Sequence, residues 1–266
     1  MLAKTRQDEM REIILRNGRA TITELAETFH VTTETVRRDL TVLSSCAPIR
    51  RVHGGAVLLP PILEDRDYEI RRITAPEEKR QIGILAAGSL SSGDIVYIDE
   101  GSVTEAFAEA IVGLQNLKIV TCSIQIAAAI QRKLKRGEIS GTLIQLGGVV
   151  EPMSGAVHSG DCFDQISRMN YTSAFFGATA VSQEGALFWS TAMAQFTRCA
   201  LARAEKRICL AESDKFGKTS FCLCAGFDMI DRIITDDTHP IPDPIIRTLR
   251  QNGTDLSIAA LAKNNR

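Results

Sequence analysis

The first part of the chain places apolar and polar residues at a helical period. One apolar stripe consists of Ile22, Leu25, Ala26 and Phe29. This spacing puts all four side chains on one face of a short amphipathic helix. Thr21 is followed three residues later by Glu24, which is the pattern of a capping box. We therefore expect the helix to begin near Thr23.

A second short helix is predicted directly after a turn. Val31 fills the turn, and either Thr32 or Thr33 can cap the helix that follows. Its apolar stripe consists of Val36, Leu40 and Leu43. Two short helices that are joined by a tight turn and packed across each other form a helix-turn-helix.

The outward face of this second helix carries side chains that suit the major groove of DNA. They are Thr33, Glu34, Thr35, Arg37 and Arg38. Hydroxyls can donate to or accept from base edges, and arginine matches guanine or phosphate oxygens. We expect Thr32, Thr33 and Thr35, near the start of this helix, to contact bases or phosphates. Phosphates repel a carboxylate, so we expect Glu34 either to accept from a cytosine amino group or to pair with Arg38 at i+4.

A basic hairpin is predicted after the two helices. From Ile49 to Val57, apolar and basic residues alternate around a glycine pair, as in a two-stranded wing. Arg50, Arg51 and His53 are expected to face the sugar-phosphate backbone or the minor groove. Taken alone, the pattern also fits a solvated hairpin with ordinary surface arginines. The preceding helices favour contact with DNA.

This region resembles the DeoR family of bacterial transcription regulators in two runs, VTTETVRRDL and RRVHGGAV. The family's usual form is a VS-x-x-T-[IV]-RRDL helix followed by an R-x-HGGA wing. Thr32 stands where the family usually has serine, and it keeps the hydroxyl. Cys46-Ala47-Pro48 replaces the commoner glycine-containing turn before the wing. The resemblance implies that residues 1–58 form a winged helix-turn-helix DNA-binding domain.

The rest of the chain alternates predicted helices with apolar strands. Residues 59–75 contain two prolines and mixed charge, and they are expected to form a linker that is partly helical. Helices are predicted over 77–90, about 105–112 and 124–134. Strands are predicted at 95–99 and 118–121 and within TLIQLGG, SAFFGA and RICLA. This alternation predicts an α/β domain over 76–266, with a largely parallel sheet between two layers of helices.

The loops at the carboxyl ends of these strands are the expected ligand site, because helix N-termini there present amides to anions. In the loop from Asp99 to Thr104, Gly101 permits a ligand to approach the backbone closely, and the side chains of Ser102 and Thr104 offer hydroxyls. Ser123, Gly147 and Gly148 occupy the corresponding loops after the next two strands. Geometry favours a phosphate cradle here, although the same residues also fit ordinary turns and caps.

The family resemblance covers nearly all of this second part, in IDEGSVT, VTCS, LGG, ESDKFG and RIITDD. It implies a sensor domain like ribose-phosphate isomerase that binds a phosphorylated sugar. The effector-binding residues that we expect from the loops and from this resemblance are Asp99, Gly101, Ser102, Val103, Thr104, Ser123, Gly147, Gly148 and Lys215. Asp99 and Lys215 also fit a simple loop ion pair. Because Val103, Cys122 and Thr197 depart from the family pattern, the expected ligand is a small anionic metabolite rather than one named sugar.

Composition and charge fit a two-part soluble protein. The chain has 266 residues, 44% of them hydrophobic, and no apolar run of transmembrane length. Its charged start is not a signal peptide, so we expect a cytoplasmic protein without membrane contact. The net charge of −1 is that of the whole chain, and it does not describe the part that is expected to bind DNA. Residues 1–57 hold nine Lys or Arg against seven Asp or Glu, and this local excess of positive charge lies mainly on the second helix and wing.

The seven cysteines are expected to be buried, reduced thiols. Cys222 and Cys224 alternate with apolar residues in FCLC, which favours a strand over a zinc site because the usual ligand spacing is missing. No metal, cofactor or catalytic residue is expected.

These features together predict a ligand-controlled transcription regulator, a repressor of a carbohydrate-metabolism operon. Because one small domain offers a limited interface to operator DNA, we expect a homo-oligomer, either a dimer or a tetramer. The alternative is a sugar-phosphate isomerase with an attached DNA-binding domain. Its acid and base would come from Asp99, Glu100, Glu212, Asp214 and Lys215, but no arrangement in the sequence selects a base.

Overall fold

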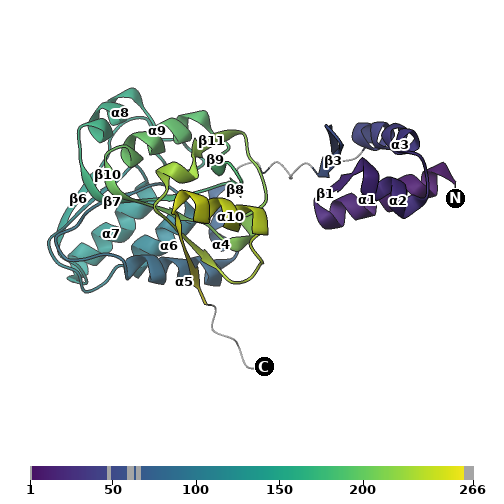
Figure 1. The fold of residues 1–266 in the computed structure, drawn as a ribbon. Helices are drawn as coiled ribbons and strands as arrows, with labels where there is room; N and C mark the ends of the chain where they lie inside the picture. Colours follow the sequence, from purple (N-terminus) through teal and green to yellow (C-terminus); the bar gives the residue numbers. More distant parts are fainter. Residues whose placement is uncertain (1, 47–48, 59–62, 64–66, 261–266) are drawn as a thin grey trace. The chain divides into compact units, whose positions relative to one another are not determined.

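The computed structural model describes residues 2–46, 49–58, 63 and 67–260, and the chain divides into two compact units (Figure 1). The units are Met1–Pro61 and Ile62–Arg266. Part of the expected linker, α4 (Tyr68–Ile73), belongs to the second unit. The buried Tyr68 hydroxyl donates to Glu105 Oε2 at 2.5 Å, and this bond attaches the helix to the α/β fold.

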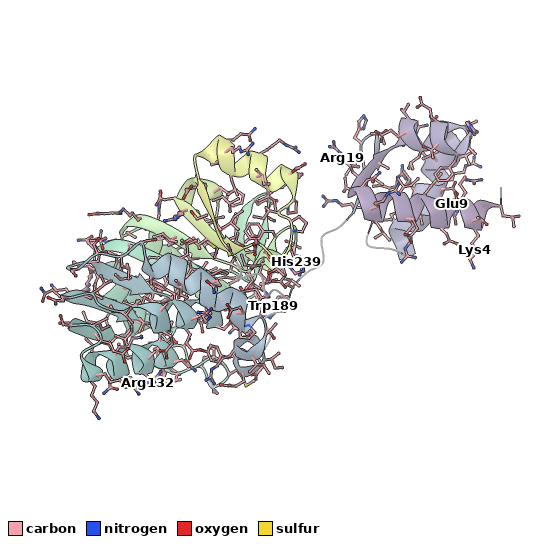
Figure 2. The ribbon with its side chains drawn as sticks, turned by 90° about the horizontal axis from the view of Figure 1, so that it is seen from below. Lys4, Glu9, Arg19, Arg132, Trp189 and His239 are labelled. Atoms are coloured by element: carbon pink, nitrogen blue, oxygen red, sulfur yellow. The ribbon has the colours of Figure 1, made fainter. Side chains whose placement is uncertain are left out.

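The first unit has the predicted winged helix-turn-helix fold. Its elements are α1 (Ala3–Asn17), β1 (Arg19–Thr21), α2 (Ile22–Phe29), α3 (Thr33–Cys46), β2 (Ile49–Val52) and β3 (Gly55–Leu58). Strand β3 pairs antiparallel with both β1 and β2. Met10, Ile14, Leu25, Val36 and Leu40 are buried in one core, so the apolar stripes of all three helices meet there. On the outside of α1, Lys4 and Glu9 are exposed (Figure 2).

The caps follow the sequence pattern. Thr21 Oγ1 accepts from Glu24 N at 3.1 Å, and Glu24 Oε2 accepts from Thr21 N at 2.8 Å. This capping box starts α2 at Ile22, one residue before the expected start. Thr32 Oγ1 accepts from Thr35 N at 3.2 Å, so Thr32 is the residue that caps α3.

The wing depends on its glycine pair. Gly54 has a φ of 88°, which L side chains rarely adopt, and it closes the hairpin between β2 and β3. A Cβ on Gly55 would lie 2.3 Å from the carbonyl oxygen of Ala20. The absence of a side chain at Gly55 therefore lets β3 approach β1, and the third strand fixes the wing to the helices.

The second unit is built on the predicted parallel sheet. In the described residues, seven strands pair in the order β13-β12-β10-β7-β4-β5-β6, and every pairing is parallel. Their bounds are β4 (Ile95–Ile98), β5 (Leu117–Thr121), β6 (Gly141–Gln145), β7 (Tyr171–Gly177), β10 (Ala204–Leu210), β12 (Arg232–Asp236) and β13 (Asp255–Ala259).

Helices cover both faces of this sheet, as expected (Figure 1). On one face lie α5 (Pro76–Ala87), α6 (Ser102–Ala110) and α7 (Ile124–Arg136), and on the other lie α8 (Gly160–Ser167), α9 (Thr191–Leu201) and α10 (Asp243–Asn252). Phe107 of α6 stacks on Phe175 of β7 with ring centroids 4.2 Å apart. The two apolar layers bury both faces of the central strands β4 and β7, which explains their continuous hydrophobic runs.

A smaller antiparallel sheet, not expected from the sequence, packs on the second layer. It consists of β8 (Ala180–Ser182), β9 (Gly185–Phe188) and β11 (Cys222–Ala225). The strand predicted at Cys222 and Cys224 is therefore confirmed. No group of three or more His, Cys, Asp or Glu in the described residues could hold a metal ion. None of the helices described is long and apolar enough to cross a membrane.

Candidate functional site

The predicted DNA-contacting side chains lie on the surface of the first unit. Those on or next to α3 are Thr32, Thr33, Glu34, Thr35, Arg37 and Arg38, and those of the wing are Arg50, Arg51 and His53. Thr35 is half-buried and the others are exposed. The first turns of α3 thus present hydroxyl, carboxylate and guanidinium groups together.

Glu34 interacts with both arginines of this face. Its carboxylate lies 3.4 Å from Arg37 Nη1 and 3.7 Å from Arg38 Nε. The expected pair with Arg38 is confirmed, and Arg37 is an additional partner. All three groups are at least half exposed, so each pair contributes little to stability and can be exchanged for contacts with DNA.

The wing is tied to α3 by one of its arginines. Arg51 Nη1 donates to Thr41 Oγ1 at 2.8 Å. Neighbouring side chains of a strand point to opposite faces, so Arg50 projects from the other side of β2. The two wing arginines are therefore not equivalent. Thr41, which fixes the position of Arg51, was not selected from the sequence.

Asp39 is a second residue that the sequence analysis missed. It is 4% exposed, and its carboxylate accepts from Arg6 Nε and Gln7 Nε2, each at 2.7 Å. These bonds hold α1 against α3. The signal was present in the sequence, because Asp39 lies at i+3 from Val36 on the same buried stripe.

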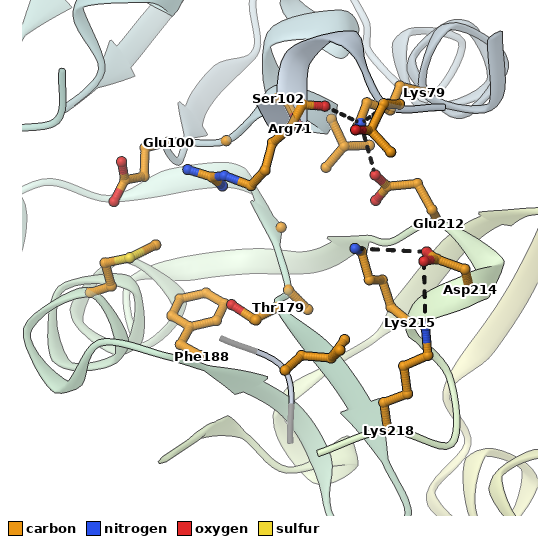
Figure 3. Close-up of a pocket in the computed structure, with 17 residues that line it drawn as sticks. Arg71, Lys79, Glu100, Ser102, Thr179, Phe188, Glu212, Asp214, Lys215 and Lys218 are labelled. Atoms are coloured by element: carbon orange, nitrogen blue, oxygen red, sulfur yellow. Dashed lines mark hydrogen bonds and ion pairs between the residues drawn. The ribbon is translucent and has the colours of Figure 1, made fainter. Parts of the chain in front are cut away.

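The second unit contains a cavity of about 110 Å³ where three strands of the parallel sheet end (Figure 3). Segment 100–103 follows β4, segment 177–179 begins at the last residue of β7, and the residues from 212 to 218 follow β10. Its lining residues are Leu63, Arg71, Thr74, Lys79, Glu100, Gly101, Ser102, Val103, Gly177, Ala178, Thr179, Phe188, Met193, Glu212, Asp214, Lys215 and Lys218. Ligands of open α/β sheets generally bind at the carboxyl ends of the strands, and this cavity lies there.

One wall of the cavity is the N-terminus of α6. Gly101 has a φ of 141°, which turns the chain so that the helix begins at Ser102. The predicted start near residue 105 was therefore wrong, and part of the expected loop is the first helical turn. The first amides of an α-helix have no partner within the helix, and the helix dipole makes this end positive. The arrangement suits an anion.

Four cationic side chains line the cavity, together with three carboxylates. Lys215 Nζ lies 3.8 Å and Lys218 Nζ lies 3.5 Å from the carboxylate of Asp214. The guanidinium of Arg71 lies over the ring of Tyr68, 5.6 Å from its centroid. His158 Nε2 lies 3.4 Å from Oε1 of the lining residue Glu100, and burial lowers the pKa of His158.

The fourth cation, Lys79, is buried at 3% exposure. Its Nζ lies 3.1 Å from Glu212 Oε1 and donates to the carbonyl oxygens of Arg71, at 2.6 Å, and Thr74. Lys79 shares a buried stripe of α5 with Ile82 and Gly83. A lysine on an apolar stripe could have been recognised from the sequence as a functional cation, but it was missed.

The cavity brings together some of the predicted effector-binding residues. Gly101, Ser102, Val103 and Lys215 line it, whereas Asp99, Thr104, Ser123, Gly147 and Gly148 do not. Thr104 Oγ1 donates to the carbonyl oxygen of Gly101, and Ser123 Oγ caps α7 by accepting from Ile126 N. Gly147 and Gly148 lie after β6, where a Cβ on Gly148 would meet Ser159 Oγ. These residues shape the neighbouring loops.

Asp99 lies in the interior rather than at the cavity. Its carboxylate accepts from Tyr97 Oη at 2.9 Å and from Thr197 Oγ1. Cys122 Sγ is 3.7 Å away. Burial raises the pKa of Asp99, although the Thr197 hydroxyl and the charge of His158 oppose this shift. Two of the positions that depart from the family pattern, Cys122 and Thr197, therefore both surround this buried carboxyl group.

Two family models match the chain. The DeoR-like helix-turn-helix domain matches residues 6–61, and the DeoR C-terminal sensor domain matches residues 74–237. Together they cover most of the sequence, and both lie within the two units of the fold.

Several curated proteins are similar over most of their length. The glycerol-3-phosphate regulon repressor of Escherichia coli is 28% identical over 231 residues, which cover 86% of this chain and 89% of the relative. The transcriptional repressor GlcR of Bacillus subtilis is 28% identical over 226 residues, or 85% of each chain.

Among solved structures, eIF2B beta of Chaetomium thermophilum is 22% identical with a TM-score of 0.42, and it covers 59% of this chain and 48% of that chain. Ribose 5-phosphate isomerase A of Neisseria gonorrhoeae is 17% identical with a TM-score of 0.35 and 52% coverage of each chain.

Proposed function

The chain belongs to the DeoR family of helix-turn-helix regulators, and we propose that it is a transcriptional repressor of a carbohydrate-metabolism operon. Relatives that match over most of their length are named as repressors, among them the glycerol-3-phosphate regulon repressor. The exposed face of α3, with the wing beside it, supports binding to double-stranded operator DNA. Such a protein acts in the cytoplasm of a bacterial cell.

The effector is a phosphorylated sugar or a related small anion bound in the cavity of the second unit. The observation that carries this proposal is the meeting of the α6 N-terminus with Arg71, Lys215 and Lys218 around one hollow. The amides and the guanidinium can hold a phosphate group. Glu100, Glu212 and Thr179 offer acceptors and a hydroxyl for the polyol part of the ligand.

A thermal-shift screen tests this assignment. The panel contains inorganic phosphate, glycerol 3-phosphate, ribose 5-phosphate and glucose 6-phosphate, with the unphosphorylated compounds beside them. A ligand that binds the folded state raises the melting temperature by mass action. The matched variants are Arg71→Ala, which removes a lining side chain, and Arg72→Ala, which removes its exposed neighbour on α4. We expect Arg71→Ala to lose the shift and Arg72→Ala to keep it; an equal shift in both variants argues against the site.

Binding without turnover is part of the proposal. Glu212 is paired with Lys79, and Asp214 with two lysines, so neither carboxylate is placed as an isolated general base. An isomerase would convert aldose phosphates to ketose phosphates. Turnover by the purified protein that disappears in Lys215→Ala would reverse this choice.

The protein acts as a homo-oligomer, a dimer or a tetramer. One DNA-binding unit of this size contacts a single half-site. Two such units in one oligomer bind repeated half-sites more tightly, because binding of the first unit raises the effective concentration of the second at its half-site. Sedimentation at micromolar concentration, with and without operator DNA, tests this step. Purely monomeric protein in both samples would contradict it.

A further inference from the structure

Two attachments hold the beginning of the sensor unit against the cavity. Leu63 lies two residues after Pro61, the last residue of the first unit. Leu63 N donates to the carbonyl oxygen of Thr219 at 2.8 Å, and Ser220 Oγ donates to the carbonyl oxygen of Leu63 at 2.7 Å. The chain that leaves the DNA-binding unit is therefore hydrogen-bonded to the segment that directly follows Lys218.

The second attachment is at the C-terminal end of α4. Lys79 has three N–H donors, and its Nζ contacts the carbonyl oxygens of Arg71 and Thr74 and the carboxylate of Glu212. Because the last carbonyls of a helix lack partners within it, this lysine caps α4. Its counter-ion Glu212 lies on the loop after β10, which also carries Lys215.

Both attachments therefore start from one segment, residues 212–220. The same segment supplies Glu212, Asp214, Lys215 and Lys218 to the cavity (Figure 3). An anion in the cavity attracts the two lysines that now share Asp214, and it competes with Glu212 for Lys79. Any such rearrangement moves the groups that hold Leu63 and α4, since they are adjacent in the chain or directly bonded.

We propose that segment 212–220 is the element that transmits effector binding to the connection with the DNA-binding unit. Effector binding acts through the Leu63 clamp, made by Thr219 and Ser220, and through the Lys79 cap of α4. This inference rests on the proposed function, because it requires an anion in the cavity. Ser220 is 8% exposed and does not line the cavity, so it is a positioning residue whose replacement deletes no side chain of the cavity lining.

Hydrogen exchange of the full chain, followed by mass spectrometry, tests the inference with inorganic phosphate as the probe. The amide of Leu63 is itself a bonded donor, so its exchange reports directly on the clamp. In the wild type we expect phosphate to change exchange both at Ser102–Thr104 and in peptides that contain Leu63. The change at Leu63 should be at least about fivefold, the lower end of typical coupling between sites.

The variant Ser220→Ala removes the hydroxyl that bonds Leu63. We expect it to keep the phosphate response at Ser102–Thr104 and to lose the response at Leu63, while Ser220→Thr keeps the first response and restores the second. The matched control is Thr254→Val, which removes another buried hydroxyl that donates to a backbone carbonyl, that of Phe227 at 3.0 Å. This control should respond as the wild type does.

The possible results distinguish a failure of this inference from a failure of the proposed function. A response at Ser102–Thr104 without any response at Leu63 in the wild type overturns the inference and leaves the proposed function standing. An unchanged Leu63 response in Ser220→Ala also overturns it. If phosphate changes exchange nowhere in the wild type, the anion site itself is wrong and the inference falls with it. The wild-type arm decides even if a variant fails to fold.

Discussion

The hydroxyl of Thr197 on α9 donates a hydrogen bond to the buried carboxylate of Asp99, at the end of β4. Asp99 is 1% exposed and Thr197 is 1% exposed, so neither group reaches solvent. The bond joins a helix on one face of the sheet to the strand end that leads into the cavity of the second unit. Asp99 therefore links α9 to the strand end directly before the loop that leads into α6.

The first prediction concerns this bond. Thr197→Val removes the donor and leaves a buried carboxylate with fewer partners, which should lower the free energy of unfolding by about 1–3 kcal/mol. Urea unfolding of the full chain measures the change. The control Thr28→Val removes an exposed hydroxyl that donates to the Glu24 carbonyl oxygen at 2.7 Å, and it should have a smaller effect. Equal stability of Thr197→Val and the wild type would show that the bond contributes nothing.

The fold could be predicted because its patterns are local. The helical stripe from Ile22 to Phe29, the capping box and the glycine pair each depend on residues a few positions apart. The apolar strand runs predicted the parallel sheet for the same reason. The start of α6 was missed by three residues, since the turn at Gly101 depends on a backbone φ angle that the sequence pattern did not reveal.

The cavity could be predicted only in part, because it is assembled from distant segments. The loop after β4 was identified from its glycine and hydroxyls. Arg71 comes from a segment interpreted as linker, and Glu212 acquires its place by pairing with Lys79, 133 positions earlier in the chain. Conversely, the sequence places Asp99 in the loop after a strand, but it does not show that Thr197, 98 positions later, is its hydrogen-bond partner.

The second prediction concerns the buried pair in the DNA-binding unit. Asp39→Ala leaves Arg6 without its carboxylate partner and frees α1 from α3, so we expect a loss of about 3 kcal/mol of stability in this unit. Calorimetry of the full chain should show a lower melting temperature for the first unit and an unchanged one for the second. Glu27→Ala, on the exposed side of α2, serves as the control. A matching profile for both variants would exclude the proposed role.

The third prediction concerns the face of α3 that we propose contacts DNA. Arg37→Ala or Arg38→Ala should weaken binding to a duplex selected from a random pool by about 1–3 kcal/mol where the side chain contacts a guanine. Where the side chain contacts a phosphate, we expect a smaller loss of affinity that does not depend on the DNA sequence. Binding is measured at one fixed salt concentration, because affinity falls steeply with salt. Arg132→Ala, on the exposed surface of α7, is the control. Unchanged affinity in both α3 variants would rule out this face.

The fourth prediction concerns pH. Burial would raise the pKa of Asp236, but hydrogen bonds from Thr238 and Ser213 outweigh it and lower the pKa below its ordinary value. The backbone amide and hydroxyl of Ser213 each donate to this carboxylate at 2.7 Å. A lowered pKa in the folded state stabilises the protein above the unfolded pKa, and this stabilisation is lost as the pH falls through the folded value.

The measurement for this fourth prediction compares melting temperatures of the wild type and Asp236→Asn across pH. The wild type should be more stable above about pH 4, the ordinary range of an aspartate, and the difference should shrink as the pH falls below it. A difference that stays constant down to pH 2 would mean that ionisation of Asp236 contributes no stability.

The most direct test of the whole account measures the affinity of the full chain for its selected duplex with and without the phosphorylated compound that gives the largest thermal shift. A ligand-controlled regulator should change its affinity for DNA by at least about fivefold when the compound is added. Arg71→Ala should bind the duplex as the wild type does and show no response to the compound. Affinity for DNA that is the same with and without a compound shown to occupy the cavity would contradict the account.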